Sequence, residues 1–218
     1  LMIQGGEGGG HTGSVPTTLL LPTVLDAVDI PVIAAGGFFD GRGLAAALAY
    51  GAAGVGMGTR FLLTADSRVP DAVKQRYLAA GLDDTVVTKK VDGMPHRMLR
   101  TELVEDVESG SGLRRLIPTA RRTLEFKKMA GMTWKQLAVD GRAMRKEQGR
   151  TLGQLALAAN TPMMLKAGLV DGDASAGVLA SGQVVGVIND LPTCEDLIDR
   201  VVTEAAAALN RTSGYLKR

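Results

Sequence analysis

Three short apolar segments, each running directly into a glycine-rich loop, constrain the fold of this chain more than any other feature. The segments end near Gln4, Ala35 and Met57. They are rich in Val, Ile and Ala and apolar on both faces, which is typical of parallel strands covered on two sides. Between them, the apolar spacing predicts helices over 16–28 and 41–50. Strand, glycine loop, helix and strand form the repeat of a parallel sheet.

Two architectures use such a repeat. A doubly wound sheet binds its ligand where the strand order reverses. A (β/α)8 barrel binds at its C-terminal rim and often holds a phosphate with the loops after its last two strands. The barrel fits better, because the consecutive loops at 36–37 and 56–59 both suit a phosphate and the later chain is mostly helical. The sequence therefore predicts an α/β fold: the C-terminal part of a TIM barrel, about strands 6 to 8, followed by a helical region.

A whole barrel needs about 250 residues, and this sequence shows only three of its repeating units. We therefore expect a missing N-terminal half of the barrel, required for folding because the strand edges would otherwise be exposed. The predicted domains are the barrel part at 1–82, a mostly helical insertion or lid domain at 83–182, and C-terminal helices at 183–218 that return to the barrel.

Local signals predict the remaining elements. Asp40 and Gly51 suit the N-cap and the C-cap of the helix at 41–50. Pro162 is expected to stop a helix, and Thr193 and Asp196 to form a capping box at the start of the last one. Further helices are predicted at 70–80, 118–150, 151–160, 182–188 and 193–209, with extended or looped chain at 83–100 and a loop-rich stretch at 165–182.

Composition excludes several classes of protein. The chain is 45% hydrophobic and 22% charged with a net charge of +2, as expected of a globular protein. Its one cysteine, Cys194, excludes a disulfide framework and a cysteine-based zinc site, and we predict no metal. No apolar run approaches the ~18 residues of a membrane helix. An aromatic content of 4% leaves little for stacking on nucleic acid bases. Cytoplasmic residence is the resulting expectation.

Four segments carry a resemblance to one family. The stretch from Gln4 to Gly13, QGGEGGGHTG, resembles the Q-G-x-E-A-G-G-H-x-G motif of the nitronate monooxygenase (2-nitropropane dioxygenase) family, with Gly9 beside further glycines where many relatives have Ala-Gly-Gly. Residues 33–42, 54–61 and 180–186 resemble its further motifs in the same order. That family includes FMN-dependent enoyl-ACP reductases. The whole chain is most similar to an actinobacterial branch of flavin-dependent dehydrogenases that act on a hydroxy-indanone carboxyl-CoA thioester in steroid breakdown.

The resemblance implies an oxidoreductase with FMN on a TIM barrel. His11 matches the family's active-site histidine, and Gln4 and Gly10 would contact the flavin. The residues that would hold the FMN phosphate are Gly36, Gly37, Gly58 and Thr59. Backbone N–H groups beside helix starts favour an anion, which agrees with that role. Arg97 and Arg100 are candidates for binding phosphates of the substrate, NAD is a candidate electron acceptor, and a homodimer is a candidate assembly.

The favoured reaction introduces an α,β double bond into a cyclic CoA thioester in cholesterol ring degradation. A neutral imidazole on His11 suits removal of the proton α to the thioester. Three alternatives stay open: a nitronate monooxygenase that uses O2, an FMN-dependent enoyl-thioester reductase, and an inactive flavin-binding paralogue. His11 does not separate thioester dehydrogenation from nitronate oxidation, because in the latter it would deprotonate a nitroalkane.

Other residues carry two readings each. Glu7 either orients His11 or caps a helix, and His96 is expected to be structural or exposed. Basic pairs at 114–115, 121–122 and 127–128 form either a solvated helix face or a patch for the phosphates of coenzyme A. A set of long apolar side chains is either core or the lining of an adaptable pocket: Met129, Met132, Trp134, Met144, Met163 and Met164.

Overall fold

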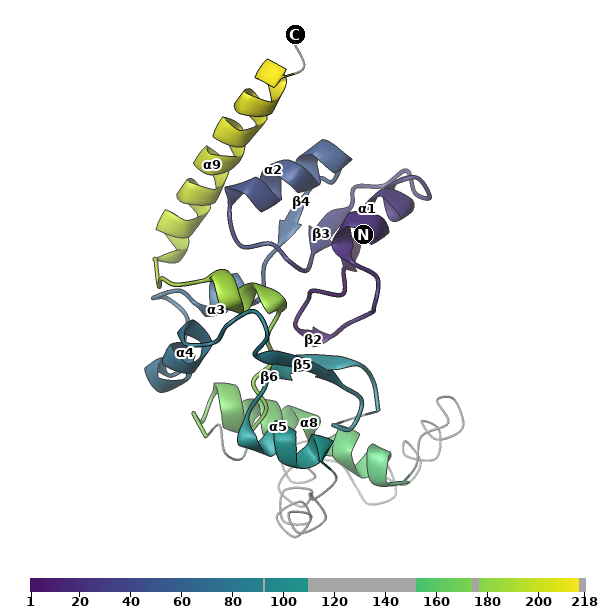
Figure 1. Cartoon of the computed structure of the whole chain (residues 1–218), viewed down its shortest axis with the longest axis vertical. Helices are drawn as coiled ribbons and strands as arrows, with labels where there is room; N and C mark the ends of the chain where they lie inside the picture. Colours follow the sequence, from purple (N-terminus) through teal and green to yellow (C-terminus); the bar gives the residue numbers. More distant parts are fainter. Residues whose placement is uncertain (92, 110–151, 174–176, 216–218) are drawn as a thin grey trace. The chain divides into compact units, whose positions relative to one another are not determined.

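The computed structural model describes residues 1–91, 93–109, 152–173 and 177–215, coloured along the sequence in Figure 1. The chain divides into two compact units. Unit 1 combines Leu1–Thr85 with Ser181–Arg218, and unit 2 is Val86–Ala180. The predicted helix at 118–150 lies outside the described residues.

A parallel sheet forms the centre of unit 1. Its strands are β1 (Met2–Gln4), β3 (Ile33–Ala35) and β4 (Gly54–Gly56), hydrogen-bonded in the order β1-β3-β4, of which β3 and β4 are labelled side by side in Figure 1. Gln4 pairs with Ala35, and Ala35 pairs with Gly56. All three predicted strands and their parallel arrangement are confirmed. Because the strands are parallel and in register, the three glycine-rich loops leave the sheet at the same edge.

Two helices connect these strands and form the core of unit 1. Helix α1 (Thr17–Leu25) follows the first glycine loop, and α2 (Gly41–Tyr50) follows the second. The predicted caps of α2 are confirmed, since Asp40 accepts the N–H of Gly43 and Gly51 takes a left-handed conformation with φ 105°. The buried residues that pack together are Leu21, Val32, Ala34, Ala47 and Ala52.

The remaining elements of unit 1 are short until the last helix. They are β2 (Gly10–His11), α3 (Thr59–Leu62), α4 (Asp71–Leu78), the 3-10 helix η2 (Gln183–Val187) and α9 (Cys194–Tyr215). The capping box of α9 is present at the predicted residues: the N–H of Asp196 donates to Thr193 Oγ1, whose hydroxyl donates to the Asp196 carboxylate. The helix continues beyond the predicted end at 209, and α3 is an element that the sequence did not indicate.

Helix α9 packs closely along α2 (Figure 1), and a glycine permits the approach. A Cβ atom at Gly41 would lie 2.3 Å from the Cβ of Glu204 and 2.5 Å from the backbone N of Ala205. No side chain fits there without moving the helix. The N–H of Gly41 instead donates to Glu204 Oε2 at 3.0 Å, so a residue of α9 also helps to cap α2.

Unit 2 contains two paired strands and two helices in its described part: β5 (Thr85–Thr88), β6 (His96–Leu99), α5 (Glu102–Glu108) and α8 (Leu152–Leu169). The strands confirm the extended chain predicted over 83–100. The prediction that Pro162 stops the helix is wrong, because α8 continues through it. Met164, just beyond the proline, is buried with Met98, Val104 and Val178, and this packing offsets the backbone hydrogen bond that proline removes.

None of the helices within the described ranges is both long and apolar enough to cross a membrane.

Candidate active site

The first glycine loop is folded around the side chain of Gln4. Its amide Nε2 donates to the carbonyl O of His11 at 2.8 Å and to that of Gly9 at 3.3 Å. A Cβ at Gly8 would lie 2.4 Å from the Gln4 amide carbon, so the loop wraps this side chain tightly. Gln4 was predicted to contact flavin. In the structure its side chain also holds the backbone of His11 in place.

His11 lies on β2 with an exposed side chain. The preceding Gly10 has φ 73°, a conformation that favours glycine, and no atom lies within 4 Å of the position that a Cβ there would take. The exposed His11 side chain is thus carried on a backbone that Gln4 holds. This placement suits a group that exchanges a proton with a bound substrate.

Glu7 caps helix α1. Its carboxylate oxygens each accept the backbone N–H of Thr17 at 3.1 Å, and Oε2 accepts the Thr17 hydroxyl at 2.8 Å. A carboxylate at a helix N-terminus satisfies otherwise unpaired N–H groups and complements the helix dipole. Of the two roles weighed from the sequence, the helix cap is confirmed.

Four backbone N–H groups form a candidate donor set for an anion. The glycines after β3, Gly36 and Gly37, have φ of 91° and 84°. Gly58 and Thr59 begin α3 after β4, with no side-chain cap. Within the described ranges, the N–H groups of these four residues donate to no acceptor. A Cβ at Gly58 would meet nothing within 4 Å, so a ligand has room to approach. These donors fit a phosphate monoester such as that of FMN.

The Thr59 hydroxyl has part of its capacity already in use. Its Oγ1 accepts the N–H of Gly182 at 2.9 Å, and the side chain is 9% exposed. The hydroxyl hydrogen stays available to a phosphate oxygen. Next to this bond, the N–H of Gln183 donates to the carbonyl O of Glu7 at 3.0 Å. Residues late in the sequence therefore join the first glycine loop to the loop after β4.

A charged cluster begins at Arg60, the residue after Thr59, and includes Asp190 and Arg200. No role for it was predicted from the sequence. The guanidinium of Arg60 is 2% exposed and donates to Asp190 Oδ1 at 2.7 Å. Arg200 donates to the other oxygen of Asp190 at 2.6 Å. Burial alone would raise the pKa of Asp190, but the hydrogen bonds from the two arginines outweigh it and lower that pKa. Arg60 stands inside a recognised motif, but nothing local in the sequence points to Asp190 as its partner.

The candidate substrate residues belong to unit 2. Arg97 lies in β6 and is half-buried, Arg100 follows β6 and is exposed, and His96 is buried with 2% exposure. Met164 is a core residue of this unit, which agrees with one of its two readings. The basic pairs and Met129, Met132, Trp134 and Met144 lie outside the described residues.

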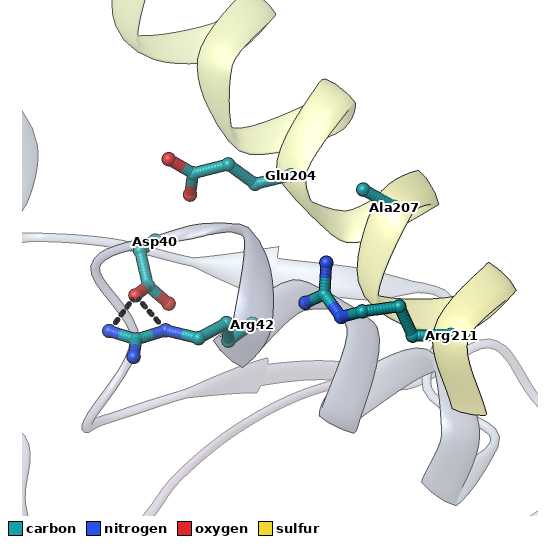
Figure 2. A pocket seen from close by; sticks show the side chains of 5 residues that line it. All are labelled: Asp40, Arg42, Glu204, Ala207 and Arg211. Atoms are coloured by element: carbon teal, nitrogen blue, oxygen red, sulfur yellow. Dashed lines mark hydrogen bonds and ion pairs between the residues drawn. The ribbon is translucent and has the colours of Figure 1, made fainter. Parts of the chain in front are cut away.

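A separate pocket of about 280 Å³ lies between α2 and α9 (Figure 2). Its lining residues are Asp40, Arg42, Glu204, Ala207 and Arg211, none of which was predicted as a site residue. Asp40 and Arg42 pair with each other at 2.5 Å, and the hydrogen bond to Asp40 raises the pKa of Arg42. Two carboxylates balance two guanidinium groups, so the pocket offers no surplus charge to a phosphate.

Comparison with known protein families identifies the family of this chain. Residues 1–204 match the sequence model of the family described as nitronate monooxygenase. The chain therefore belongs to the nitronate monooxygenase family, which confirms the resemblance carried by the four motifs.

Two relatives are similar to this chain over nearly its whole length. The chain is 66% identical over 205 residues to a protein of Rhodococcus jostii, with 94% of this chain and 58% of the relative covered. It is 63% identical over 220 residues to one of Mycobacterium tuberculosis, with 100% and 62% covered. Both are named (3aS,4S,5R,7aS)-5-hydroxy-7a-methyl-1-oxo-octahydro-1H-indene-4-carboxyl-CoA dehydrogenase. The chain thus spans about three fifths of the length of these curated relatives.

A solved structure supports the fold. FabK from Thermotoga maritima superimposes with a TM-score of 0.70 at 31% sequence identity, over 98% of this chain and 56% of that one.

Proposed function

We propose that this chain contributes the FMN phosphate site and the catalytic histidine of a flavin-dependent dehydrogenase. The observation that carries the proposal is the set of four unengaged N–H donors at one sheet edge, on Gly36, Gly37, Gly58 and Thr59. Such donors stabilise a phosphate dianion without a metal or a neutralising side chain. Gln4 and Gly10 would face the flavin ring, on the loop that also carries His11.

His11 is the proposed base. Bound FMN would supply the redox chemistry by accepting the hydride that leaves the β carbon of the substrate. The imidazole would take the proton from the α carbon, so that the two electrons of the broken C–H bond form the new double bond. Gln4 supports this step by holding the His11 carbonyl, which fixes where the ring stands.

The proposed substrate is a bicyclic hydroxy-indanone carboxyl-CoA thioester from steroid ring degradation. The support is the name that two relatives carry, which are 63–66% identical over 94–100% of this chain. A thioester lowers the pKa of its α proton, which a histidine can remove near neutral pH. Arg97 and Arg100 are the residues in the described part of unit 2 that we propose for the phosphates of coenzyme A.

An anaerobic visible spectrum of the full-length protein tests this proposal. Adding the thioester should bleach the flavin absorbance, and His11→Ala should retain bound FMN while bleaching about 10²- to 10⁴-fold more slowly. Bleaching at an unchanged rate in His11→Ala would remove the histidine from the mechanism. Purified protein without any flavin, even after incubation with FMN, would contradict the cofactor assignment.

Nitronate oxidation is a second candidate, favoured by the name of the family model. An enoyl-thioester reductase is the same hydride step in reverse. Two further assays separate these candidates from thioester dehydrogenation. Consumption of O2 during aerobic turnover of an alkyl nitronate, when the thioester has no effect, would favour nitronate oxidation. Anaerobic bleaching by a nicotinamide cofactor, followed by reoxidation by an enoyl thioester, would favour the reductase. Bound flavin that reacts with none of these substrates would favour an inactive flavin-binding paralogue.

The three-stranded sheet of unit 1 leaves apolar side chains uncovered. Leu1 and Met2 at β1 are 55% and 63% exposed, and Leu19 on α1 is 62% exposed. Apolar side chains beside an open strand edge favour further strands as partners. We propose that a preceding half of the barrel covers them. We also propose that NAD is the electron acceptor, that the protein forms a homodimer, and that it resides in the cytoplasm. Nicotinamide turnover assays, light scattering and cell fractionation test these three.

A further inference from the structure

One late segment of the chain follows the loop after β4 along its whole length. We call residues 181–194 the return segment. Three hydrogen bonds donated by backbone N–H groups join it to residues 59–66: Gly182 N to Thr59 Oγ1 at 2.9 Å, Ala65 N to Pro192 O at 2.8 Å, and Cys194 N to Asp66 Oδ2 at 2.6 Å. These contacts hold the backbone on both sides of α3, whose four residues are too few to form a stable helix alone.

Arg60 stands at the centre of these contacts. Beside its bond to Asp190 Oδ1, its Nη2 donates to the carbonyl O of Asp190 at 2.9 Å and to that of Leu63 at 2.5 Å. A guanidinium that binds one carboxylate and two carbonyls is fixed in its plane. Asp190 is in turn held by Arg200 from α9. The orientation of the α3 backbone is therefore determined by residues about 130 positions later in the chain.

The cluster also brings a buried charge close to the proposed phosphate site. Arg60, which is 2% exposed, and the more exposed Arg200 are positive and Asp190 is negative, while the carboxylates of Glu204 and Asp196 also act on Arg200. Arg60 is adjacent in sequence to Thr59, one of the four proposed phosphate donors. In a buried setting such a charge acts over a short distance with little screening.

We propose that Arg60 and Asp190 are positioning residues for the cofactor phosphate: their ion pair aims the N–H groups of Gly58 and Thr59. The inference rests on the proposed function, since it needs FMN as the ligand. It assigns the ion pair a ligand-specific task beyond folding. An ion pair that only stabilised unit 1 would support the isoalloxazine ring and the phosphate equally.

Riboflavin separates these two roles, because it has the ring of FMN and lacks the phosphate. The experiment uses full-length apoprotein and follows quenching of FMN and riboflavin fluorescence. Asp190→Ala should raise the Kd for FMN about tenfold, the scale of one hydrogen bond to a charged group, and change the Kd for riboflavin less than twofold. Asp190→Asn retains an acceptor for Arg60 and should fall between Asp190→Ala and the wild type.

The matched control is Arg42→Gln. Arg42 also pairs with an aspartate, but it is 74% exposed and its partner Asp40 lies two residues away on the same helix start. Its loss should leave both Kd values within twofold of the wild type. Arg60→Met tests the other side of the pair. Asp190 is 38% exposed and Asp190→Asn retains an oxygen acceptor for the buried Arg60, so this variant keeps the comparison of FMN with riboflavin available where Arg60→Met does not fold.

Equal weakening of both ligands by Asp190→Ala, or an unchanged Kd for FMN, would overturn the inference while the proposed function stands. Wild-type apoprotein that binds neither FMN nor riboflavin would overturn both. A selective loss of FMN affinity would establish that the return segment sets the phosphate site.

Discussion

The two loops that carry the proposed phosphate donors are held in different ways. The loop after β3 is shaped locally: Gly36 and Gly37 adopt positive φ, and the carbonyl O of Gly36 lies 3.0 Å from the Thr17 hydroxyl, whose one hydrogen it shares with Glu7 Oε2. The loop after β4 has no positive-φ residue and depends on the distant Asp190 and Gly182. One site thus combines a loop fixed by backbone conformation with a loop fixed by long-range contacts.

The two loops should take their final shape at different stages of folding. The first loop can form as soon as β1, β3 and α1 have assembled. We expect the second to acquire its final shape only when the return segment and α9 are in place, because its long-range contacts come from there. Ligand affinity should therefore respond to changes in the C-terminal part of unit 1, far from the phosphate in sequence.

The largest effect should follow a change in the local loop. In Gly36→Ala, the new Cβ would lie 3.0 Å from the carbonyl O of Gly5 and 3.1 Å from its N, at a φ of 91°. Strain of this kind costs about 1–3 kcal/mol, and the donor N–H would move with the backbone. We expect a corresponding fall in the urea unfolding free energy and at least about a tenfold loss of FMN affinity.

Gly13→Ala is the control for that experiment. Gly13 belongs to the first glycine loop and does not have positive φ, and no atom lies within 4 Å of the place that a methyl group there would take. Its substitution should change the unfolding free energy by less than about 0.5 kcal/mol. Similar losses in Gly36→Ala and Gly13→Ala would show that the local loop is not fixed by its backbone conformation.

A smaller effect is expected at Glu7. Glu7→Ala removes the acceptor for the Thr17 N–H and should cost about 0.5–2 kcal/mol of stability, the usual range for a lost helix cap. Glu7→Gln retains an oxygen acceptor and should cost less. Because the carboxylate caps α1, the pH profile of turnover should be the same in Glu7→Gln as in the wild type. A shifted profile would return Glu7 to the role of orienting His11.

The same contrast explains what the sequence could predict. The strands, the α2 caps and the glycine loops follow from neighbouring residues, and each was found where the pattern indicated. Helix α8 was predicted to stop at Pro162 because the local rule ignores the packing of Met164 in the core of unit 2. The Arg60–Asp190 pair was missed for a related reason: no local pattern connects residues so far apart.

The four proposed phosphate donors follow from the family motifs together with the general affinity of glycine loops for anions. The structure adds which N–H groups are unengaged. It also adds that the Thr59 oxygen already accepts one hydrogen bond, which no motif reveals. Gln4 shows the same limit: its residue type suggested a ligand contact, whereas its bond to the His11 carbonyl required the folded loop.

The smallest effect should come from acid acting on the long-range loop. Hydrogen bonds from Arg200 and Arg60 hold the pKa of Asp190 below its ordinary value despite burial. A carboxylate with a depressed pKa stabilises the folded state above its unfolded pKa, about 3.9, and loses that contribution as the pH falls through the folded value. The stability difference between wild type and Asp190→Asn should therefore be constant above about pH 5 and shrink below pH 4. Since Asp190 is 38% exposed, we expect about 1 kcal/mol or less, measured by urea unfolding at each pH. A difference that stayed constant down to pH 2 would show that the charge of Asp190 contributes nothing to holding Arg60, and that the loop after β4 relies on its backbone hydrogen bonds alone.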